Sequence, residues 1–191
     1  MPNVQQRTLV ALVEDKPGVL NRISSLLRRR NFNIESIAVG QSTQPKLARI
    51  TIVVGGDNPR VEQVRKQLDK IIEVVKIVDV TSYSSVAREI ALIKVKATPS
   101  TRAEIIQVVD IFRGSIVDVS ADSLIIEVTG DEDKIDSFLE LLRGFGIREI
   151  ARTGLIALTR GGVGPLLVDE DKISKKPSKT PRLETEHAPD W

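Results

Sequence analysis

Apolar positions along residues 7–158 switch between the spacing of strands and that of helices, in an order that occurs twice. Residues 7–14 are nearly continuously apolar, which predicts a strong strand. The next segment has apolar residues at helical spacing, which predicts an amphipathic helix. Its apolar face holds Val19, Leu20, Ile23, Leu26 and Leu27.

The rest of the first half continues the pattern with three further strands and a second helix. Strands are expected at residues 33–40, 47–54 and 74–81, with a polar turn at 41–46. Residues 55–59 stop the third strand and start the second helix, with Pro59 in its first turn. The buried stripe of that helix is expected to hold Val61, Val64, Leu68, Ile71 and Ile72. The order is β-α-β-β-α-β, the ferredoxin-like split unit.

After a short polar connector at residues 83–86, the same order begins again. Strands are expected at residues 90–97, 115–119, 124–129 and 147–158, with helices after Pro99 and after Gly130. The inward positions of these two helices are Ile105, Ile106, Val109 and Phe112, and then Ile135, Phe138, Leu139 and Leu142. The fold class is therefore α+β, with two tandem ferredoxin-like βαββαβ domains over residues 1–82 and 83–162.

Residues 163–191 differ in composition from the two domains. They mix Pro, Lys, Ser, Thr, Glu and Asp with few apolar residues, which predicts a disordered tail. The lysines at positions 172, 175, 176 and 179 have two interpretations, a docking patch or a solvated linker.

The turn between the first strand and the first helix contains the main candidate chemistry. Asp15 precedes the first helical turn, Pro17 is expected near its first position, and Gly18 allows close approach of the backbone. A helix start presents free N–H groups and the positive end of a dipole, which suit an anion. The adjacent carboxylate of Asp15 suits a cation, so the pair matches a free amino acid. The alternative interpretation is structural: Asp15 caps the helix and the turn has no ligand.

Composition narrows the possible chemistry further. The chain has no cysteine, which excludes disulfides, thiolate nucleophiles and cysteine-based metal sites. Its only histidine, His187, lies near the end of the chain, so we expect no catalytic residues and no metal site. No apolar run is long enough to span a bilayer and no signal-peptide pattern is present, so we expect a cytoplasmic protein.

Nucleic-acid binding is not expected. The net charge is only +2, and the predicted strands carry no phenylalanine on which bases could stack. The four phenylalanines, Phe32, Phe112, Phe138 and Phe145, fall on helices or at their ends. Residues Arg28–Arg30 have two interpretations, the solvated last turn of a helix or a contact with an anionic surface of a partner.

Several segments together resemble the small subunit of acetolactate synthase (acetohydroxyacid synthase), whose N-terminal part is an ACT domain. The resemblance spans residues 5–162. It is carried by VEDKPGVLNRI, RRNFNIESI, LARITIVV, KQLDKIIEVVKI, VAREIALIKV, IFRGSIVDV and IARTGLIALTRG. The Asp-x-Pro-Gly turn is common to many ACT domains, whereas the NIES strand, the FRG turn and the closing RTGLIALTRG segment together are a strong signal of this family.

The resemblance implies a regulatory subunit that is not an enzyme by itself. Such subunits activate a large catalytic subunit and confer feedback inhibition by valine, in a complex that makes acetolactate from two pyruvates. Thiamine diphosphate, Mg and FAD are expected in that partner, and no cofactor in this chain. The alternative function is a stand-alone amino-acid-sensing ACT protein that acts on a transcriptional or signalling partner.

The resemblance also implies a homodimer with an effector site where two ACT domains pair. The implied valine-binding residues come from the turn and helix start and, from the partner subunit, the second strand. They are Asp15, Lys16, Pro17, Gly18, Val19, Leu20, Asn33 and Ile34.

Overall fold

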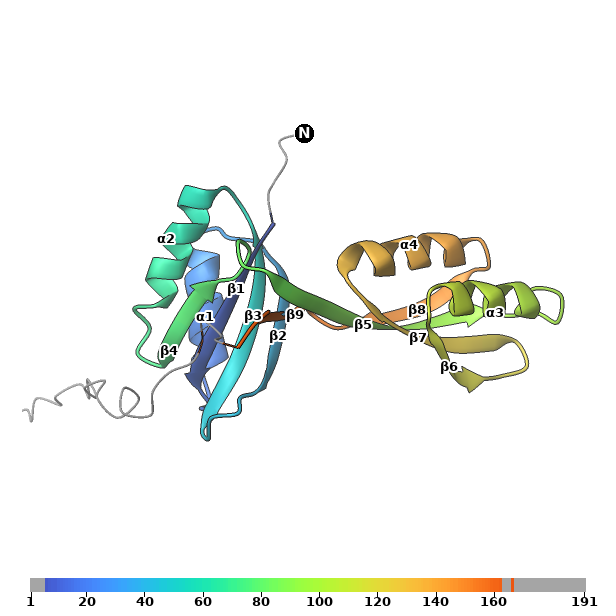
Figure 1. The fold of residues 1–191 in the computed structure, drawn as a ribbon, viewed down its shortest axis with the longest axis horizontal. Helices are drawn as coiled ribbons and strands as arrows, with labels where there is room; N and C mark the ends of the chain where they lie inside the picture. The colour runs from blue at the N-terminus through green and yellow to red at the C-terminus, as the bar shows by residue number, and fades with distance from the viewer. Residues whose placement is uncertain (1–5, 163–165, 167–191) are drawn as a thin grey trace, which may run out of the picture.

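The first domain is a four-stranded antiparallel sheet with two helices on one face. The computed structural model describes residues 6–162 and residue 166. In chain order the elements of the domain are β1 Gln6–Glu14, α1 Val19–Arg29, β2 Ile34–Gln41, β3 Leu47–Gly55, α2 Asn58–Leu68 and β4 Val74–Asp79. The strand order β2-β3-β1-β4 makes β2 and β4 the edges of the sheet (Figure 1).

The second domain repeats this topology. Its elements are β5 Ser85–Lys96, α3 Arg102–Ile111, β6 Ser115–Val119, β7 Ser123–Gly130, α4 Glu132–Arg143, β8 Ile147–Arg152 and β9 Ile156–Thr159. The sheet has the order β6-β7-β5-β8, and β9 pairs with β5 away from that path. The predicted α+β class with two βαββαβ units is therefore confirmed.

Each domain has its own apolar core between its helices and its sheet. In the first domain, alternate residues of β1, such as Leu9 and Ala11, face α1 and α2 and are fully buried. In the second domain, Phe138 on α4 is the largest fully buried side chain and packs against Phe112 with ring centroids 5.0 Å apart. Each large apolar side chain that is fully buried in this way stabilises its domain by about 1.5–3 kcal/mol.

The predicted apolar stripes are correct at most positions and wrong at three. Ile72 is 48% exposed because α2 ends at Leu68 and the chain has already left the helix. Ile106 on α3 is 38% exposed and Leu20 in the first turn of α1 is 45% exposed. Helical spacing does not show how far the opposing sheet extends, so residues at the border of a stripe are the ones it misassigns.

A two-stranded ribbon, formed by the first residues of β5 and all of β9, joins the domains (Figure 1). Ser85 pairs with Thr159 and Arg88 with Ile156. The ribbon covers the face of the first sheet opposite the helices. It does so through a buried cluster of Val10, Leu12, Leu47, Val80, Ala157 and Leu166. The predicted polar connector at residues 83–86 is therefore confirmed only at 83–84, because β5 begins at Ser85, and the prediction of one continuous strand at 147–158 was wrong.

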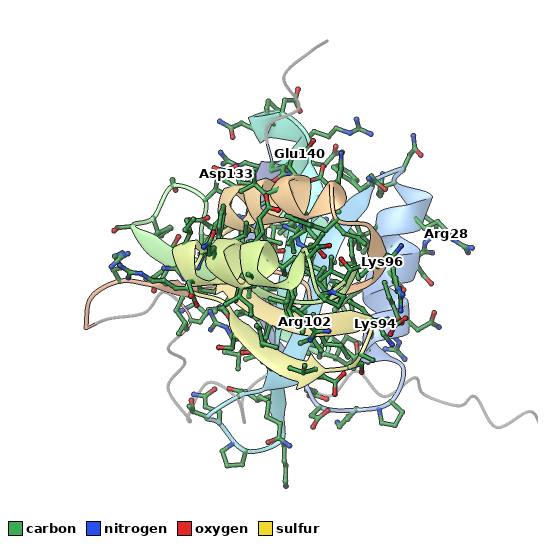
Figure 2. The ribbon with its side chains drawn as sticks, turned by 90° about the vertical axis from the view of Figure 1, so that its right-hand side faces the viewer. Arg28, Lys94, Lys96, Arg102, Asp133 and Glu140 are labelled. Carbon is green, nitrogen blue, oxygen red and sulfur yellow. The ribbon has the colours of Figure 1, made fainter. Side chains whose placement is uncertain are left out.

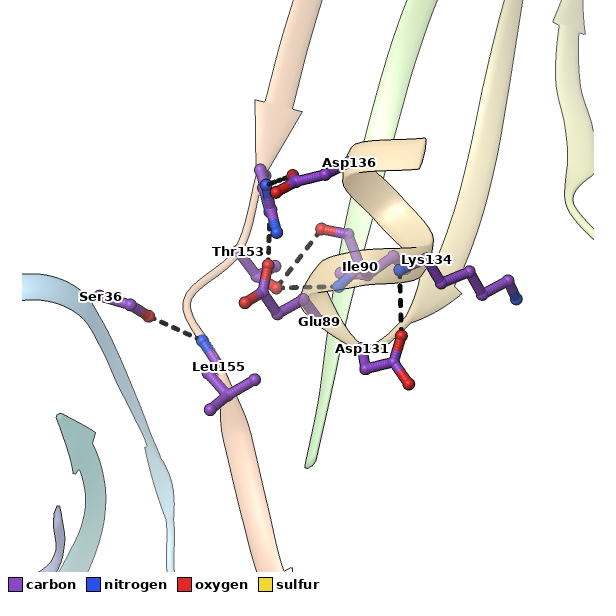
Figure 3. Close-up of polar contacts among 9 residues, drawn as sticks. Ser36, Glu89, Ile90, Asp131, Lys134, Asp136, Thr153 and Leu155 are labelled. Atoms are coloured by element: carbon purple, nitrogen blue, oxygen red, sulfur yellow. Dashed lines mark hydrogen bonds and ion pairs between the residues drawn. The ribbon is translucent and has the colours of Figure 1, made fainter. Parts of the chain in front are cut away.

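The break between β8 and β9 lies where the chain contacts β2 of the first domain. A Cβ added to Gly154 would lie 2.4 Å from the carbonyl oxygen of Ile37, so only glycine fits at this approach. The amide of Leu155 donates to Oγ of Ser36 at 2.8 Å (Figure 3). These residues leave the second sheet to pack on the first, which is why the strand stops.

The segment between β8 and β9, residues 153–155, is the joint between the two domains. Polar contacts within the second domain hold its other side (Figure 3). The amide of Ile90 on β5 donates to Oγ1 of Thr153 at 3.1 Å. Arg152 donates to Glu89, which is only 8% exposed, and to Asp136 on α4 at 2.6 Å. Although burial opposes its charge, the two carboxylates raise the pKa of Arg152.

The predicted tail, residues 163–191, lies outside the described residues apart from Leu166. That side chain is 7% exposed and belongs to the cluster under the ribbon. The predicted domain boundary at residue 162 therefore leaves out one residue that packs against the first domain.

Candidate functional site

The turn between β1 and α1 is open to solvent at the end of the first domain. Asp15, Lys16, Pro17 and Gly18 are exposed, whereas Val19 is buried at 4% exposure and anchors the helix start. Gly18 has φ +88°, the left-handed region, and a Cβ there would meet nothing within 4 Å. Glycine is therefore required by the backbone conformation and not by a lack of space.

The start of α1 has no side-chain cap. Gly18 is the N-cap residue, so the structural interpretation of Asp15 as a cap was wrong, and Pro17, expected near the first helical position, lies two residues before it. The left-handed Gly18 delays the helix to Val19, and the amide of Asp15 instead donates to the carbonyl of Lys46 at 2.8 Å. The amide of Val19 donates to the carbonyl of Lys16 at 3.5 Å, whereas the next two amides of the first turn have no intrahelical acceptor and are available to an anion.

Charged neighbours surround this helix start. Lys16 pairs with Glu14 at 2.6 Å, and the hydrogen bond to Glu14, together with that carboxylate's charge, raises the pKa of Lys16. Arg22 on α1 pairs with Glu73, which precedes β4. Glu14 is thus held by Lys16, and Asp15 is an exposed carboxylate next to that pair.

Within one chain, the remaining predicted residues lie at the opposite end of α1. Asn33 and Ile34 follow the helix, and a helix of 11 residues is about 16 Å long. Asn33 is exposed and Ile34 is partly buried against the first core. A single chain thus brings together Asp15–Leu20, but not these with Asn33 and Ile34.

Two residues at the site were missed from the sequence. Glu14 binds Lys16, and Lys46, in the turn between β2 and β3, accepts the amide of Asp15 while holding a left-handed φ of 63°. The antiparallel register pairs Glu14 with Leu47. Aligning the predicted end of the first strand with the start of the 47–54 strand, in antiparallel register, would therefore have placed the 41–46 turn beside Asp15.

Residues 6–162 and 166 contain no group of three or more Asp, Glu or His placed to hold a metal ion. Over the same residues, no helix is long and apolar enough to cross a membrane. Arg28 at the far end of α1 is exposed and points away from the molecule (Figure 2), in agreement with a solvated last turn.

The fold and the site define a class. An ACT-type βαββαβ domain followed by a second domain of the same topology is the architecture of a two-domain regulatory subunit. Residues 9–76 match the family described as "AHAS small subunit-like ACT domain", and residues 88–161 match "Small subunit of acetolactate synthase".

This chain matches individual members of the family over nearly the whole length of each relative. The chain is 56% identical to a probable acetolactate synthase small subunit of Archaeoglobus fulgidus, over 82% of this chain and 98% of the relative. It is 52% identical to the small subunit of Mycolicibacterium smegmatis, over 82% of this chain and 94% of the relative. The crystal structure of the Thermotoga maritima small subunit superposes with a TM-score of 0.78 at 44% identity, covering 84% of this chain and all of that one.

The chain therefore belongs to the acetolactate synthase small-subunit family and is the regulatory, non-catalytic subunit of that enzyme. A small subunit implies a large, catalytic partner, and the enzyme belongs to the biosynthesis of branched-chain amino acids. The resemblance on which the prediction rested is thus confirmed.

Proposed function

We propose that this chain activates the large subunit of acetolactate synthase and makes the complex sensitive to feedback inhibition by valine. The large subunit would carry thiamine diphosphate, Mg and FAD and join two pyruvates into acetolactate and CO2. Family membership supports this over a stand-alone sensor with a transcriptional or signalling partner.

The observation that carries the proposal is the uncapped start of α1 beside Asp15. The valine carboxylate would accept hydrogen bonds from the amides of the first helical turn, where the dipole favours a negative charge. The ammonium would lie at Asp15. Leu20 is 45% exposed although it is aliphatic, and it would pack on the valine side chain. Since one methylene changes affinity by about 1–3 kcal/mol, leucine and isoleucine should bind the same site with different strength.

The topology supports completion of the site by a second copy of the chain. β2 is an edge strand, and its end at Gln41 pairs with Ala48, beside the end of β1 at Glu14. Antiparallel pairing of two β2 strands would bring the start of the partner's β2 to that end. The partner's Asn33 and the partner's Ile34 would then lie near Asp15–Leu20, and the two sheets would become one.

Two substitutions test the site. Asp15→Ala removes the ammonium partner, and Gly18→Asp introduces a carboxylate that repels the ligand carboxylate and disfavours the left-handed conformation. Loss of a hydrogen bond to a charged group costs about 1.5–3 kcal/mol, so valine affinity should fall at least about tenfold. Arg28→Ala, at the other end of the same helix, is the matched control.

Calorimetry with valine and inhibition of the reconstituted enzyme provide the measurements. Weaker valine binding and weaker inhibition, with activation of the large subunit retained, would support the proposal. Valine binding that is equal in all three variants and the unmodified chain would exclude this site. Failure of the chain to co-purify with a large subunit would instead favour the stand-alone sensor.

A further inference from the structure

A groove of about 370 Å³ lies between the outer face of the first sheet and the β5–β9 ribbon. Its floor is formed by small or polar residues of β2 and β3, among them Ala38, Gly40 and Thr51. Its wall is apolar and consists of Val86 on β5 and of Ile156 and Leu158 on β9. Ile156 and Leu158 are 61% and 64% exposed, so the wall is open to a ligand. The groove shares no residue with the proposed valine site.

Arg49, on the floor of this groove, has no acidic partner in the described part of the chain. Arg49 on β3 is half-buried, and its terminal nitrogen donates to the carbonyl of Ala157 at 2.6 Å. Within residues 6–162 and 166, no carboxylate forms an ion pair with it, and burial lowers the pKa of Arg49. Arg88, exposed at the rim, donates to the carbonyl of Ala87. The groove therefore combines positive charge with apolar walls.

This combination selects for a particular ligand chemistry. A guanidinium has five N–H donors in a planar fork, and a carboxylate matches two of them at once. The wall offers only hydrocarbon, which favours an aliphatic body. We propose that the groove binds a small aliphatic monocarboxylate, with its carboxylate on Arg49 and its alkyl chain against Val86, Ile156 and Leu158.

The proposed ligand would also act on the ribbon. Arg49 links β3 to β9 through Ala157, so a carboxylate that orients the guanidinium also holds β9 against the first sheet. The groove is lined by residues of β2 and β3 on the first sheet and of β5 and β9 on the ribbon, so its two sides belong to the two parts that the Arg49 contact connects. Occupancy would therefore stiffen the connection between the two domains.

The first test uses a pair of ligands that differ only in charge. The full-length chain, uniformly labelled with 15N, is titrated with 3-methylbutanoate and, separately, with the neutral 3-methylbutanamide. Neither ligand carries an ammonium group, so Asp15 does not favour them. We expect saturable shifts at the amides of Ala38, Gly40 and Ala157 with the acid, and at least about tenfold weaker binding of the amide.

The second test removes the guanidinium. Arg49→Met keeps a long apolar stem and should weaken binding of the acid at least about tenfold, whereas Arg49→Lys keeps the charge and should retain part of the affinity. Arg60→Met is the control, because Arg60 lies over the ring of Phe32 at 4.8 Å and does not line the groove. Dispersed amide spectra establish that each variant is folded.

Three results would overturn the inference. They are equal affinity for the acid and the amide, unchanged affinity in folded Arg49→Met, and shifts confined to residues 15–20. The last result would show that the acid binds at the helix start. The valine titration of Asp15→Ala is a separate measurement. Absence of acid binding in the groove therefore leaves the proposed valine site untouched, and absence of valine binding leaves the groove proposal untouched.

Discussion

Replacing Gly154 by alanine tests the contact that joins the two domains. The added Cβ would lie 2.4 Å from the carbonyl oxygen of Ile37, 2.6 Å from its carbonyl carbon and 2.9 Å from Oγ of Ser36. Two of these atoms belong to the backbone of a strand, so they do not rotate away. Alanine therefore forces the 153–155 segment off β2.

The cost can be worked from the geometry. Ordinary contact begins at 3.4 Å, so the two backbones must separate by about 1 Å. Such overpacking costs about 1–3 kcal/mol. The shift also breaks the 2.8 Å bond from the amide of Leu155 to Ser36, which contributes about 0.5–1.5 kcal/mol. We expect a total destabilisation of the joint of about 2–4 kcal/mol.

Amide hydrogen exchange and urea unfolding measure this effect. Exchange should accelerate at Leu155 and along β9, while the core of the second domain around Phe138 keeps its protection. Ser36→Ala removes only the hydrogen bond and should show a smaller change at the same amides. Gly144→Ala is the matched control, because a Cβ there meets nothing within 4 Å and the residue has φ −60°.

The reasoning fails if Gly154→Ala unfolds and exchanges like the unmodified chain. It also fails if Gly144→Ala is destabilised as much as Gly154→Ala, since the effect would then not come from the close approach to β2.

Two further predictions concern charged groups of the second domain. Glu89→Gln removes the charge from a carboxylate that is 8% exposed and bound to Arg152; it should destabilise the protein by about 1–3 kcal/mol in urea unfolding, and an unchanged midpoint would contradict this. The hydrogen bond from Arg148 lowers the pKa of Asp122 from its ordinary value. This pairing therefore stabilises the fold at neutral pH and is lost as the pH falls through the lowered pKa. Arg148→Met should move the carboxyl titration of Asp122 upward in NMR, and an unmoved titration would rule out the pairing.

Much of the proposed site could be read from the sequence because its components are consecutive. Asp15, Gly18 and Leu20 lie in one turn and the start of one helix, and local rules govern both. The backbone detail was wrong, because a left-handed Gly18 and an amide bond to Lys46 depend on how the β2–β3 turn packs beside it. The contribution of Asn33 and Ile34 stays a prediction, since it requires a second chain.

The two βαββαβ units were predictable because the periods of helices and strands are local properties of the chain. The nearly continuous apolar run of β1 also agrees with its structure, in which Leu9 faces the helices and Val10 faces the ribbon. The alternation of residues 147–158 shows which side chains share a face, but it does not specify which sheet they join.

Only the tertiary structure decided that choice. A strand continues until a neighbouring backbone blocks it, and here β2 does so at Gly154, which sends β9 to pair with the start of β5. The ribbon, the groove that contains Arg49 and the burial of Leu166 all follow from this redirection. They depend on contacts between residues far apart in the chain, whereas the order of helices and strands follows from residues close together in it.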